Sequence, residues 1–247
     1  MFNQENLSSQ LALPFFYTDN FNSSQKAILL DEDTSRHVVQ VLRMKKGELL
    51  NLTDGKGHLL TTEITGEHKK HCEVVVTEMK FVPSPIRKIS IGLSLIKNNS
   101  RFEWFLEKAT ETGVDEIIPL ICERTEKQKF RSDRLKNIVI SAMLQSQQCW
   151  LPVLHEPVQF KTAVENAKQQ QKFIGHCIEE EKQNLPDVIN EAMSSQLILI
   201  GPEGDFSKSE IDFALQHHFI PVALGNTRFR TETAGIAAAI LLKIVKK

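Results

Sequence analysis

The sequence predicts an α/β protein with a parallel sheet, preceded by a smaller domain built mainly of strands. From residue 86 onward, apolar segments with the period of a strand alternate with segments that have the period of a helix, as in parallel α/β sheets. Before that point the apolar segments are short and are separated by turn residues, as in small β structures. A chain of 247 residues is long enough for one or two such domains.

The boundary between the two regions is predicted at Val82-Pro-Ser-Pro-Ile86. Two prolines disfavour a helix and give a stiff, extended connection. We therefore expect a first domain over residues 1–82 and a second domain over residues 83–247.

The first domain is expected to be a small β-barrel with one short helix. The residues Asp54-Gly-Lys-Gly57 separate two apolar segments and predict the turn of a hairpin. Val38, Val41 and Leu42 lie at helical spacing, which predicts one helix over Asp33–Lys45. The predicted strands are Phe15–Tyr17, Ala27–Leu30, Leu49–Thr53, Leu59–Ile64 and Cys72–Thr77.

The second domain begins with a predicted strand over Ile89–Leu95, in which apolar residues alternate. Helical spacing follows from Phe102 to Ala109 and ends near Gly113, a residue type typical of the position after a helix. The later predicted strands are Ile117–Ile121, Phe173–Cys177, Leu197–Ile200 and Val222–Leu224, and the later predicted helices are Ser132–Gln148, Phe160–Gln170 and Ala234–Val245.

The charge distribution excludes a protein that coats nucleic acid through bulk charge, because the net charge is −1. Two local segments are basic: residues 124–136 carry six Lys or Arg against two acids, and residues 228–247 carry five against one. They flank two glycine-containing turns, which favours a partner that bears phosphates. We expect a cytoplasmic protein without a membrane span or a signal peptide. No spacing typical of metal ligands is present, so no metal site is expected.

Two strand-to-helix connections near the C-terminus carry the clearest functional signal. The apolar run Leu197–Ile200 meets Gly201 and Gly204, and Ser207-Lys-Ser-Glu210 then has the spacing of a capping box. Val222–Leu224 similarly meets Gly225, before a helix that a threonine can begin. Helix starts expose backbone N–H groups beside the strand ends, so the two connections predict a crevice for a small polar ligand.

These connections read GPEGDFS at residues 201–207 and LG…RTETA at residues 224–234, and they resemble the RsmE family of the SPOUT superfamily of RNA methyltransferases. Two further segments resemble other motifs of that family: RHVVQVLR at residues 36–43, and EKATETGV at residues 107–114 with Lys97 and Arg101 before it. The resemblance covers nearly the whole chain. It implies a PUA-like RNA-binding β-barrel over residues 1–82 and a SPOUT domain over residues 83–247, with a C-terminal trefoil knot that holds the cofactor.

The resemblance also implies an activity: transfer of a methyl group from S-adenosylmethionine to N3 of a uridine in 16S ribosomal RNA, on the small ribosomal subunit. It implies a homodimer and no metal. Two alternatives stay open. One is methylation of another ribosomal or transfer RNA position with the same cofactor, and the other is a non-catalytic RNA-binding factor for ribosome assembly.

Methyl transfer to uridine N3 requires positioning of both reactants, together with removal of the weakly acidic N3 proton or stabilisation of the resulting anion. Arg230 is the leading candidate to hold a phosphate or to stabilise a developing uridine anion. Glu232 is predicted either to cap the last helix or to act as a base. The candidate cofactor-binding residues comprise turn glycines, apolar walls and hydroxyls, namely Ile200, Gly201, Glu203, Gly204, Leu224, Gly225, Phe229, Arg230, Thr231 and Thr233.

The candidate RNA-binding residues are Arg36, His37, Arg43, Lys97 and Arg101. Arg36 and Arg43 are seven residues apart, so both are expected on one face of the predicted short helix, where they can grip phosphates.

Several positions depart from the family pattern or stay ambiguous. The usual EQSxR of the middle helix is Leu144-Gln-Ser-Gln-Gln148 here, and Phe229 replaces a leucine. Asp205 stands where a glycine is usual; if the position needs a positive φ, Asp is among the residues that tolerate it. Trp104 lies at helical spacing and is expected in the core rather than on an RNA base.

Overall fold

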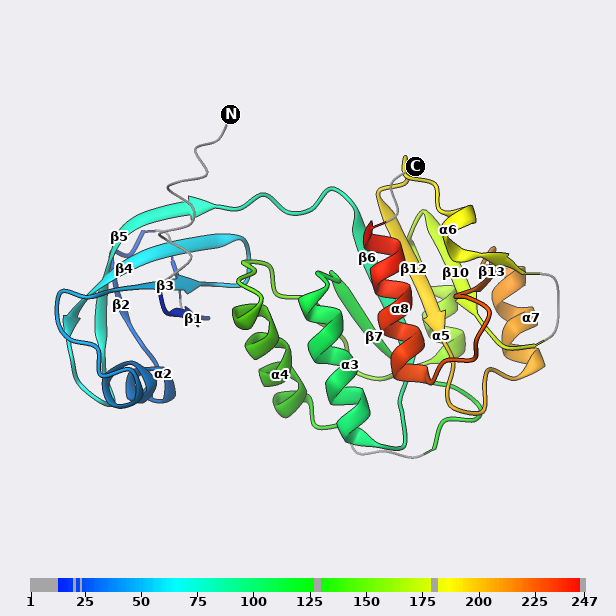
Figure 1. Ribbon diagram of the computed structural model, residues 1–247, viewed down its shortest axis with the longest axis horizontal. Coiled ribbons are helices and arrows are strands. Elements are labelled where there is room, and N and C mark those ends of the chain that lie inside the picture. The colour runs from blue at the N-terminus through cyan, green and yellow to red at the C-terminus, as the bar shows by residue number, and fades with distance from the viewer. Residues whose placement is uncertain (1–12, 20, 23, 127–129, 179–181, 245–247) are drawn as a thin grey trace. The chain divides into compact units, whose positions relative to one another are not determined.

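The computed structural model describes residues 13–19, 21, 22, 24–126, 130–178 and 182–244. The chain forms two compact units, shown in Figure 1. One unit comprises residues 1–84 with 143–151, and the other comprises residues 85–142 with 152–247. The segment 143–151, which the sequence placed with the second domain, therefore groups with the first unit.

The first unit is built on a five-stranded sheet in the order β1-β3-β4-β5-β2. Its strands are β1 (Phe15–Tyr17), β2 (Ala27–Leu29), β3 (Leu49–Thr53), β4 (His58–Gly66) and β5 (Glu73–Phe81). All five predicted strands are present. The predicted hairpin turn joins the antiparallel strands β3 and β4, and Gly55 and Gly57 within it have φ of 67° and 99°. Leu50, Leu52 and Leu60 are fully buried in the core of this unit.

The short helix of the first unit differs from its prediction. The α-helix α2 (Glu32–Arg36) is capped by the Asp31 side chain and continues as a π-helix, η1 (His37–Val41). The helix then ends, and Arg43 has a φ of 57°. A π turn advances more residues than an α turn, so the helical register shifts. The prediction of one regular helix over Asp33–Lys45 was wrong, and Arg36 and Arg43 do not share a helical face.

The second unit is built on a parallel sheet in the order β11-β13-β10-β12-β6-β7-β8, with β9 also paired to β7. The parallel α/β prediction is confirmed. The strands are β6 (Lys88–Ser94), β7 (Glu116–Ile121), β8 (Val153–Leu154), β9 (Val158–Gln159), β10 (Gln171–Gly175), β11 (Gln183–Asn184), β12 (Ser195–Ile200) and β13 (Ile220–Ala223). The sequence did not predict β8, β9 and β11, because two residues are too few to show a period.

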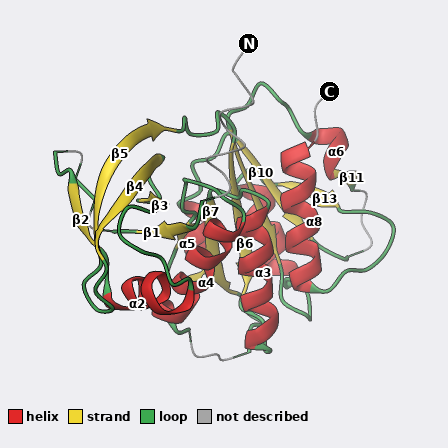
Figure 2. Ribbon diagram, turned by 60° about the vertical axis from the view of Figure 1, so that its left-hand side comes forward, coloured by secondary structure: helices red, strands yellow, loops and turns green. Residues whose placement is uncertain are grey.

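Helices cover both faces of this sheet (Figures 1 and 2). On one face α3 (Asn99–Glu111) and α8 (Thr231–Ile244) lie side by side. On the other face α5 (Phe160–Glu165) and α7 (Lys208–Gln216) pack on Leu197 and Leu199 of β12. The remaining helices are α4 (Ser132–Gln145) and α6 (Leu185–Val188). The described cysteines are free, and Cys177 is the exposed one among them.

The start of α7 confirms the capping box read from the sequence. The Ser207 hydroxyl accepts a hydrogen bond from the Glu210 N–H at 3.3 Å, and the Glu210 carboxylate accepts one from the Ser207 N–H at 2.9 Å. Glu210 is buried and also accepts a hydrogen bond from the Glu123 N–H at 2.8 Å. The helix start is therefore fixed directly beside the turn that precedes it.

Helix α8 packs closely on the sheet at Gly235. A Cβ atom at Gly235 would lie 2.4 Å from Leu93 Cδ1 and 2.7 Å from Phe105 Cε2, and both of those side chains are fully buried. We expect Gly235→Val to lower the free energy of unfolding by about 1–3 kcal/mol, because a filled core cannot accept extra carbons without moving. Urea denaturation measures this change.

The matched control for Gly235→Val is Gly204→Ala. A Cβ at Gly204 would meet its nearest neighbour, Arg124 Cδ, at an ordinary distance of 3.5 Å. This variant should change the free energy of unfolding by less than about 0.5 kcal/mol. If the two variants were equally stable, the close packing of Leu93 and Phe105 around Gly235 would not limit the size of the side chain at this position.

Candidate functional site

A cavity of about 590 Å³ lies at the carboxyl ends of three neighbouring strands of the second unit. The strand register places Gly175 of β10 between Ile200 of β12 and Val222 of β13. The segments that follow these strands line the cavity together with the start of α8. This edge of a parallel sheet is where small ligands bind in α/β proteins. The sequence predicted the ends of β12 and β13 there, and the strand order adds β10 between them.

The cavity brings together eight of the ten candidate cofactor-binding residues. They are Ile200, Gly201, Glu203, Leu224, Gly225, Phe229, Arg230 and Thr231. The other two do not line it. The carbonyl of Gly204 accepts a hydrogen bond from Arg124 Nη1 at 2.6 Å, and Thr233 lines a neighbouring groove.

Twelve of the residues that line this cavity were not among the candidates from the sequence. They are Gly175, His176, Cys177, Lys182, Pro202, Asp205, Val222, Ala223, Asn226, Thr227, Arg228 and Ala234. The predicted strand over Phe173–Cys177 was the available signal for the first three, since its carboxyl end must meet the same edge of a parallel sheet. For Lys182 no local pattern exists. Its Nζ donates to the carbonyls of His176 and Ile178 at 2.8 and 2.6 Å, which fixes it against the segment after β10.

The turn after β12 is tightly built. A Cβ at Gly201 would lie 3.0 Å from the Phe206 backbone nitrogen, and the Phe206 ring is fully buried. Asp205 has a φ of 65°, in the left-handed region that Asp tolerates better than most residues. Gly225, in the second connection, has a φ of 138°, a conformation that favours glycine. Both connections therefore adopt backbone conformations that continue neither the strand nor the helix.

The lining of the cavity suits a ligand with an apolar ring and charged ends. Ile200, Val222 and Leu224 supply apolar surface, while the lining also contains cations such as Lys182 and anions such as Glu203. The volume lies in the usual range for small-molecule sites, roughly 300–1,000 Å³.

A shallow groove of about 700 Å³ adjoins the cavity where α3 and α8 begin. It is lined by Ser100, Arg101, Trp104, Arg228, Phe229, Arg230, Glu232 and Thr233. Three of these residues, Arg228, Phe229 and Arg230, line the cavity as well. The two hollows are therefore separated by one short segment, and that segment carries two arginines.

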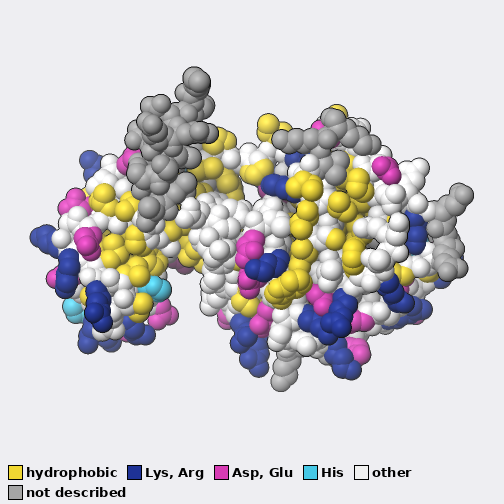
Figure 3. Space-filling view, in the orientation of Figure 1, with side chains coloured by type: hydrophobic (Ala, Val, Ile, Leu, Met, Phe, Trp, Pro, Cys, Tyr) yellow, Lys and Arg dark blue, Asp and Glu magenta, His cyan; other side chains and the backbone are white. Residues whose placement is uncertain are grey.

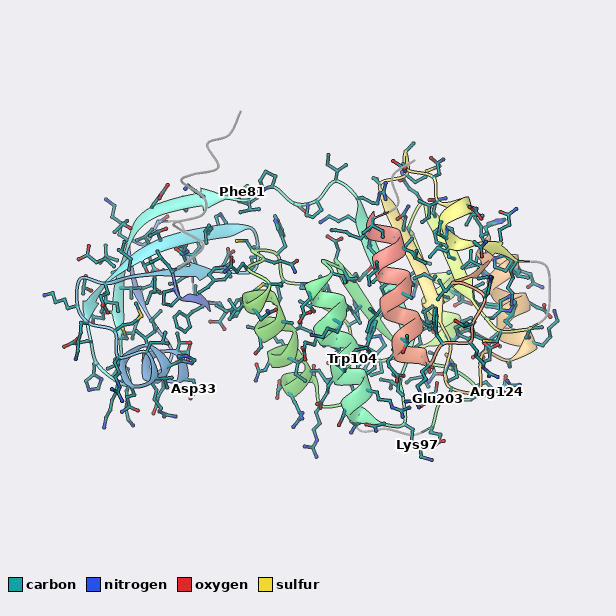
Figure 4. The ribbon with its side chains drawn as sticks, viewed as in Figure 1. Asp33, Phe81, Lys97, Trp104, Arg124 and Glu203 are labelled. Carbon is teal, nitrogen blue, oxygen red and sulfur yellow. The ribbon has the colours of Figure 1, made fainter. Side chains whose placement is uncertain are left out.

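Trp104 lies on the groove rather than in the core, and the prediction for it was wrong. Its side chain is 44% exposed, whereas Phe102, Phe105 and Leu106 on the same helix are buried. Trp104 falls between those positions on the helix, so its ring points away from the face that packs on the core. Figure 4 labels it on α3.

Glu232 is the most unusual side chain of the groove. It is buried in the first turn of α8, and its Oε1 lies 3.6 Å from Arg101 Nε. Its Oε2 is buried without a hydrogen-bond partner among the described residues. The carboxylate therefore interacts with Arg101 and does not cap the helix through a backbone hydrogen bond. An unsatisfied buried carboxylate oxygen is costly, so a donor brought to this carboxylate would stabilise it.

Lys97, Arg124 and Glu203 gather at the end of the second unit where α3 and α8 begin (Figure 4). Lys97 Nζ lies 3.1 Å from a carboxylate oxygen of Glu126, and the Lys97 N–H donates to Glu203 Oε1 at 3.3 Å. Arg124 belongs to the basic run 124–136, of which residues 127–129 lie outside the described residues.

The other RNA-binding candidates lie in the first unit. Arg36 is exposed and pairs with Glu32 at 3.0 Å and with Asp33 at 3.6 Å. The His37 ring packs edge-on against Phe16, with 5.6 Å between the ring centroids. Arg43 follows the π-helix as described above.

No helix in the described part of the chain is both long and apolar enough to span a membrane. No group of three or more His, Cys, Asp or Glu side chains within that part is arranged to hold a metal ion.

Comparison with known proteins assigns both parts of the chain. Residues 82–243 match the model of an RNA methyltransferase domain, and residues 30–77 match that of an RNA methyltransferase PUA domain. Ribosomal RNA small subunit methyltransferase E of Buchnera aphidicola subsp. Schizaphis graminum is 30% identical over 244 residues, which cover 94% of this chain and 96% of that protein.

Solved structures agree with these matches. Ribosomal RNA small subunit methyltransferase E from Neisseria gonorrhoeae, bound to S-adenosyl methionine, is 29% identical with a TM-score of 0.82, covering 92% of this chain and 95% of that one. A protein from Legionella pneumophila in complex with the bound cofactor SAM is 30% identical with a TM-score of 0.84, covering 93% of this chain and 96% of that one. The chain thus belongs to the RNA methyltransferase family that contains ribosomal RNA small subunit methyltransferase E, the family that its paired turns resemble.

Proposed function

We propose that this protein transfers a methyl group from S-adenosylmethionine to N3 of a uridine in 16S ribosomal RNA, on the small ribosomal subunit. One observation carries the proposal: the cavity and the shallow groove beside it share Arg228, Phe229 and Arg230. A cofactor in the cavity and a nucleotide in the groove would meet across that segment. Two relatives that cover nearly the whole chain are solved with this cofactor bound.

The residues of the cavity fit S-adenosylmethionine. Ile200, Leu224 and Phe229 would provide apolar walls for the adenine, and the turns at Gly201 and Gly225 would provide backbone groups for its polar atoms. The charged residues of both signs match a ligand with an ammonium, a carboxylate and a sulfonium group. When bound, the cofactor supplies an activated methyl group.

The residues of the groove fit the other requirement of the reaction, which is a uridine whose N3 is ready to attack. Glu232 Oε2 lacks a hydrogen-bond donor among the described residues, and the N3–H of uridine is a donor. Glu232 would accept that proton, and Arg230 would stabilise the resulting charge on the base. Arg101, 3.6 Å from Glu232, would hold the carboxylate in place, and Trp104 offers an exposed ring on which a base can stack.

We further propose that residues 1–82 bind RNA and that residues 83–247 carry the reaction. The match of residues 30–77 to a PUA domain of RNA methyltransferases supports the first assignment. Arg36, His37 and Arg43 are the proposed RNA contacts of the first domain, and Lys97 and Arg101 are those of the second. The proposed location is the cytoplasm, where ribosomal RNA is processed.

We also propose that the C-terminal segment forms the trefoil knot of SPOUT proteins. Supporting this, β13 pairs with β10 and not with the strand that precedes it, β12. Helix α8 then returns across the sheet to contact β6 and α3.

The protein is proposed to act as a homodimer through α8. Hydrophobic side chains gather along α8 in Figure 3, and Ile240 and Ile244 are 39% and 64% exposed. Exposed apolar groups of this kind typically mark an interface. We expect Ile240→Lys to convert the dimer to monomer in sedimentation equilibrium. Ile86→Lys, at an apolar residue that is 91% exposed but lies outside α8, should leave the dimer unchanged. A monomeric unaltered protein would contradict the dimer proposal.

The activity is tested by incubating the protein with labelled S-adenosylmethionine and small ribosomal subunits that lack the modification. The RNA is then digested and its nucleosides are identified by mass. Labelled 3-methyluridine is the expected product. Label in a different nucleoside, or in transfer RNA, would support the alternative target, and cofactor binding without any labelled RNA would contradict the proposed substrate. Absence of cofactor binding would contradict a methyltransferase altogether.

A further inference from the structure

The Asp205 carboxylate accepts hydrogen bonds from two backbone N–H groups. Its Oδ2 accepts from the Cys177 N–H at 2.7 Å, and its Oδ1 accepts from the N–H of the next residue, Phe206, at 2.8 Å. Both bonds join a carboxylate to a backbone N–H, a class of hydrogen bond that is stronger than one between neutral groups. The residue adopts its φ of 65° while making them.

The Cys177 bond joins two separate walls of the cofactor cavity. Cys177 follows β10, Asp205 follows β12, and both residues line the cavity. The two strands are neighbours, with Gly175 beside Ile200 at their carboxyl ends. Beyond those ends the sheet hydrogen bonds stop, so the side chain of Asp205 continues the pairing of the two segments where the backbone no longer does.

Two other bonds hold the same turn, but they attach it to segments outside the cavity. Arg124 Nη1 donates to the Gly204 carbonyl, and the Lys97 N–H donates to Glu203. Neither Arg124 nor Lys97 lines the cavity. Of these three attachments, the one made by Asp205 therefore acts on the shape of the cavity itself.

We propose that Asp205 is a positioning residue that fixes the segment after β10 in the geometry that binds the cofactor. Asp205 has a left-handed backbone conformation, which is strained for Asp and unstrained for glycine. The bond to Cys177 offsets this strain. Because the segment after β10 is already ordered before the cofactor binds, binding has no entropy cost for ordering it, and the affinity for the cofactor is higher. This inference rests on the proposed function, because it concerns the site assigned to S-adenosylmethionine.

Three substitutions separate the side-chain bond from the backbone conformation. Asp205→Gly removes the bond and relieves the strained φ. Asp205→Asn keeps an oxygen acceptor and tolerates the same φ, because Asn and Asp are the residues most often found there. Asp205→Ala removes the bond and keeps the strain, and therefore serves to measure what strain alone adds.

We expect Asp205→Gly to raise the Kd for S-adenosylmethionine about tenfold, since a hydrogen bond to a charged group contributes roughly this much. Asp205→Asn should stay within about threefold of the unaltered protein, because a neutral acceptor retains part of the bond. In the methyl-transfer assay, KM for the cofactor should rise in Asp205→Gly while kcat at saturation stays within about twofold, as expected for loss of uniform binding.

A second readout does not depend on the cofactor. In the ligand-free protein, amide hydrogen exchange at Cys177 should be faster in Asp205→Gly than in the unaltered protein, and Asp205→Asn should retain most of the protection. If Asp205→Gly matches the unaltered protein in both Kd and exchange, the inference is overturned. It is also overturned if all three variants lose affinity equally and unfold at equally lowered temperatures, because that pattern indicates a general structural role. Failure of the unaltered protein to bind S-adenosylmethionine would instead overturn the proposed function, while the exchange result would still report on the bond.

Discussion

Arg230→Ala is expected to lower kcat for methyl transfer by about 10²–10³-fold, the usual effect of removing one group that stabilises transition-state charge. Arg230 lines both the cavity and the groove, so in the proposed reaction its guanidinium would lie near the base on which negative charge develops. Single-turnover transfer to ribosomal subunits at saturating cofactor measures the change.

Two further variants complete this test. Arg230→Lys separates the effect of the charge from that of the planar guanidinium, and Lys243→Ala is the control. Arg230→Lys keeps the charge but loses the planar fork of donors, so an intermediate rate is expected. Lys243→Ala removes a cation from the other end of the same helix, where Lys243 donates to the Gly113 carbonyl, and its rate should stay near that of the unaltered protein. If Arg230→Ala raises only the Kd for the cofactor and leaves kcat unchanged, Arg230 belongs to the cofactor site alone.

The sequence predicted much of the fold because most of its signals are local. The continuous apolar run Leu197–Ile200, the glycines after it and the capping box at Ser207 all act within a few residues. The same holds for the hairpin turn at residues 54–57, whose glycines take positive φ as such a turn requires. Parallel order follows in turn from the alternation of strands and helices.

The errors arose where a non-local contact or an unusual backbone decides the outcome. No periodicity distinguishes a π-helix from an α-helix over His37–Val41, since both bring apolar residues to one side. Trp104 has helical spacing but lies beside the buried face of α3 and not on it. In both cases the apolar residues indicated a helix, but their spacing did not show on which face of the helix each residue lies.

The position of the cavity was predicted because strand ends form it. The contacts between its side chains were not predicted, because they join residues far apart in the chain. The contact of Arg101 with Glu232 joins α3 to α8, and the bond of Asp205 to Cys177 joins the ends of β12 and β10. Such pairs follow from the strand order β13-β10-β12-β6, which no local pattern encodes. For Glu232 the sequence left two roles open, a helix cap and a base, and the structure adds that its carboxylate lies 3.6 Å from Arg101.

Glu232→Gln is expected to lower kcat by about 10²–10⁴-fold, the range for loss of a general base. The substitution keeps the size of the side chain and one carbonyl oxygen but removes the negative charge. Because Glu232 lines the groove and not the cavity, the Kd for S-adenosylmethionine should stay within about twofold of the unaltered value, as expected for a group that acts on the other reactant. Calorimetry and single-turnover rates together separate these two effects.

Glu103→Gln provides the matched control, because it makes the same chemical change on α3 at an ion pair with Arg134 that lies outside the groove. The Arg134 guanidinium donates to both carboxylate oxygens of Glu103, at 2.7 and 2.9 Å, so the control should lose about 1 kcal/mol of stability and stay nearly as active as the unaltered protein. Arg101→Ala should also slow transfer, and the double variant with Glu232→Gln should be little slower than Glu232→Gln alone, because residues that act as one unit are not additive.

A near-normal rate in Glu232→Gln would show that the carboxylate is not the proton acceptor. The unpartnered Oε2 would then reflect a structural role, and the unfolding temperature, rather than the rate, should respond to the substitution. Conversely, a slow Glu232→Gln protein that unfolds at the normal temperature and binds the cofactor normally leaves the uridine step as the one affected. That combination cannot arise from a helix cap, because loss of a cap acts through stability.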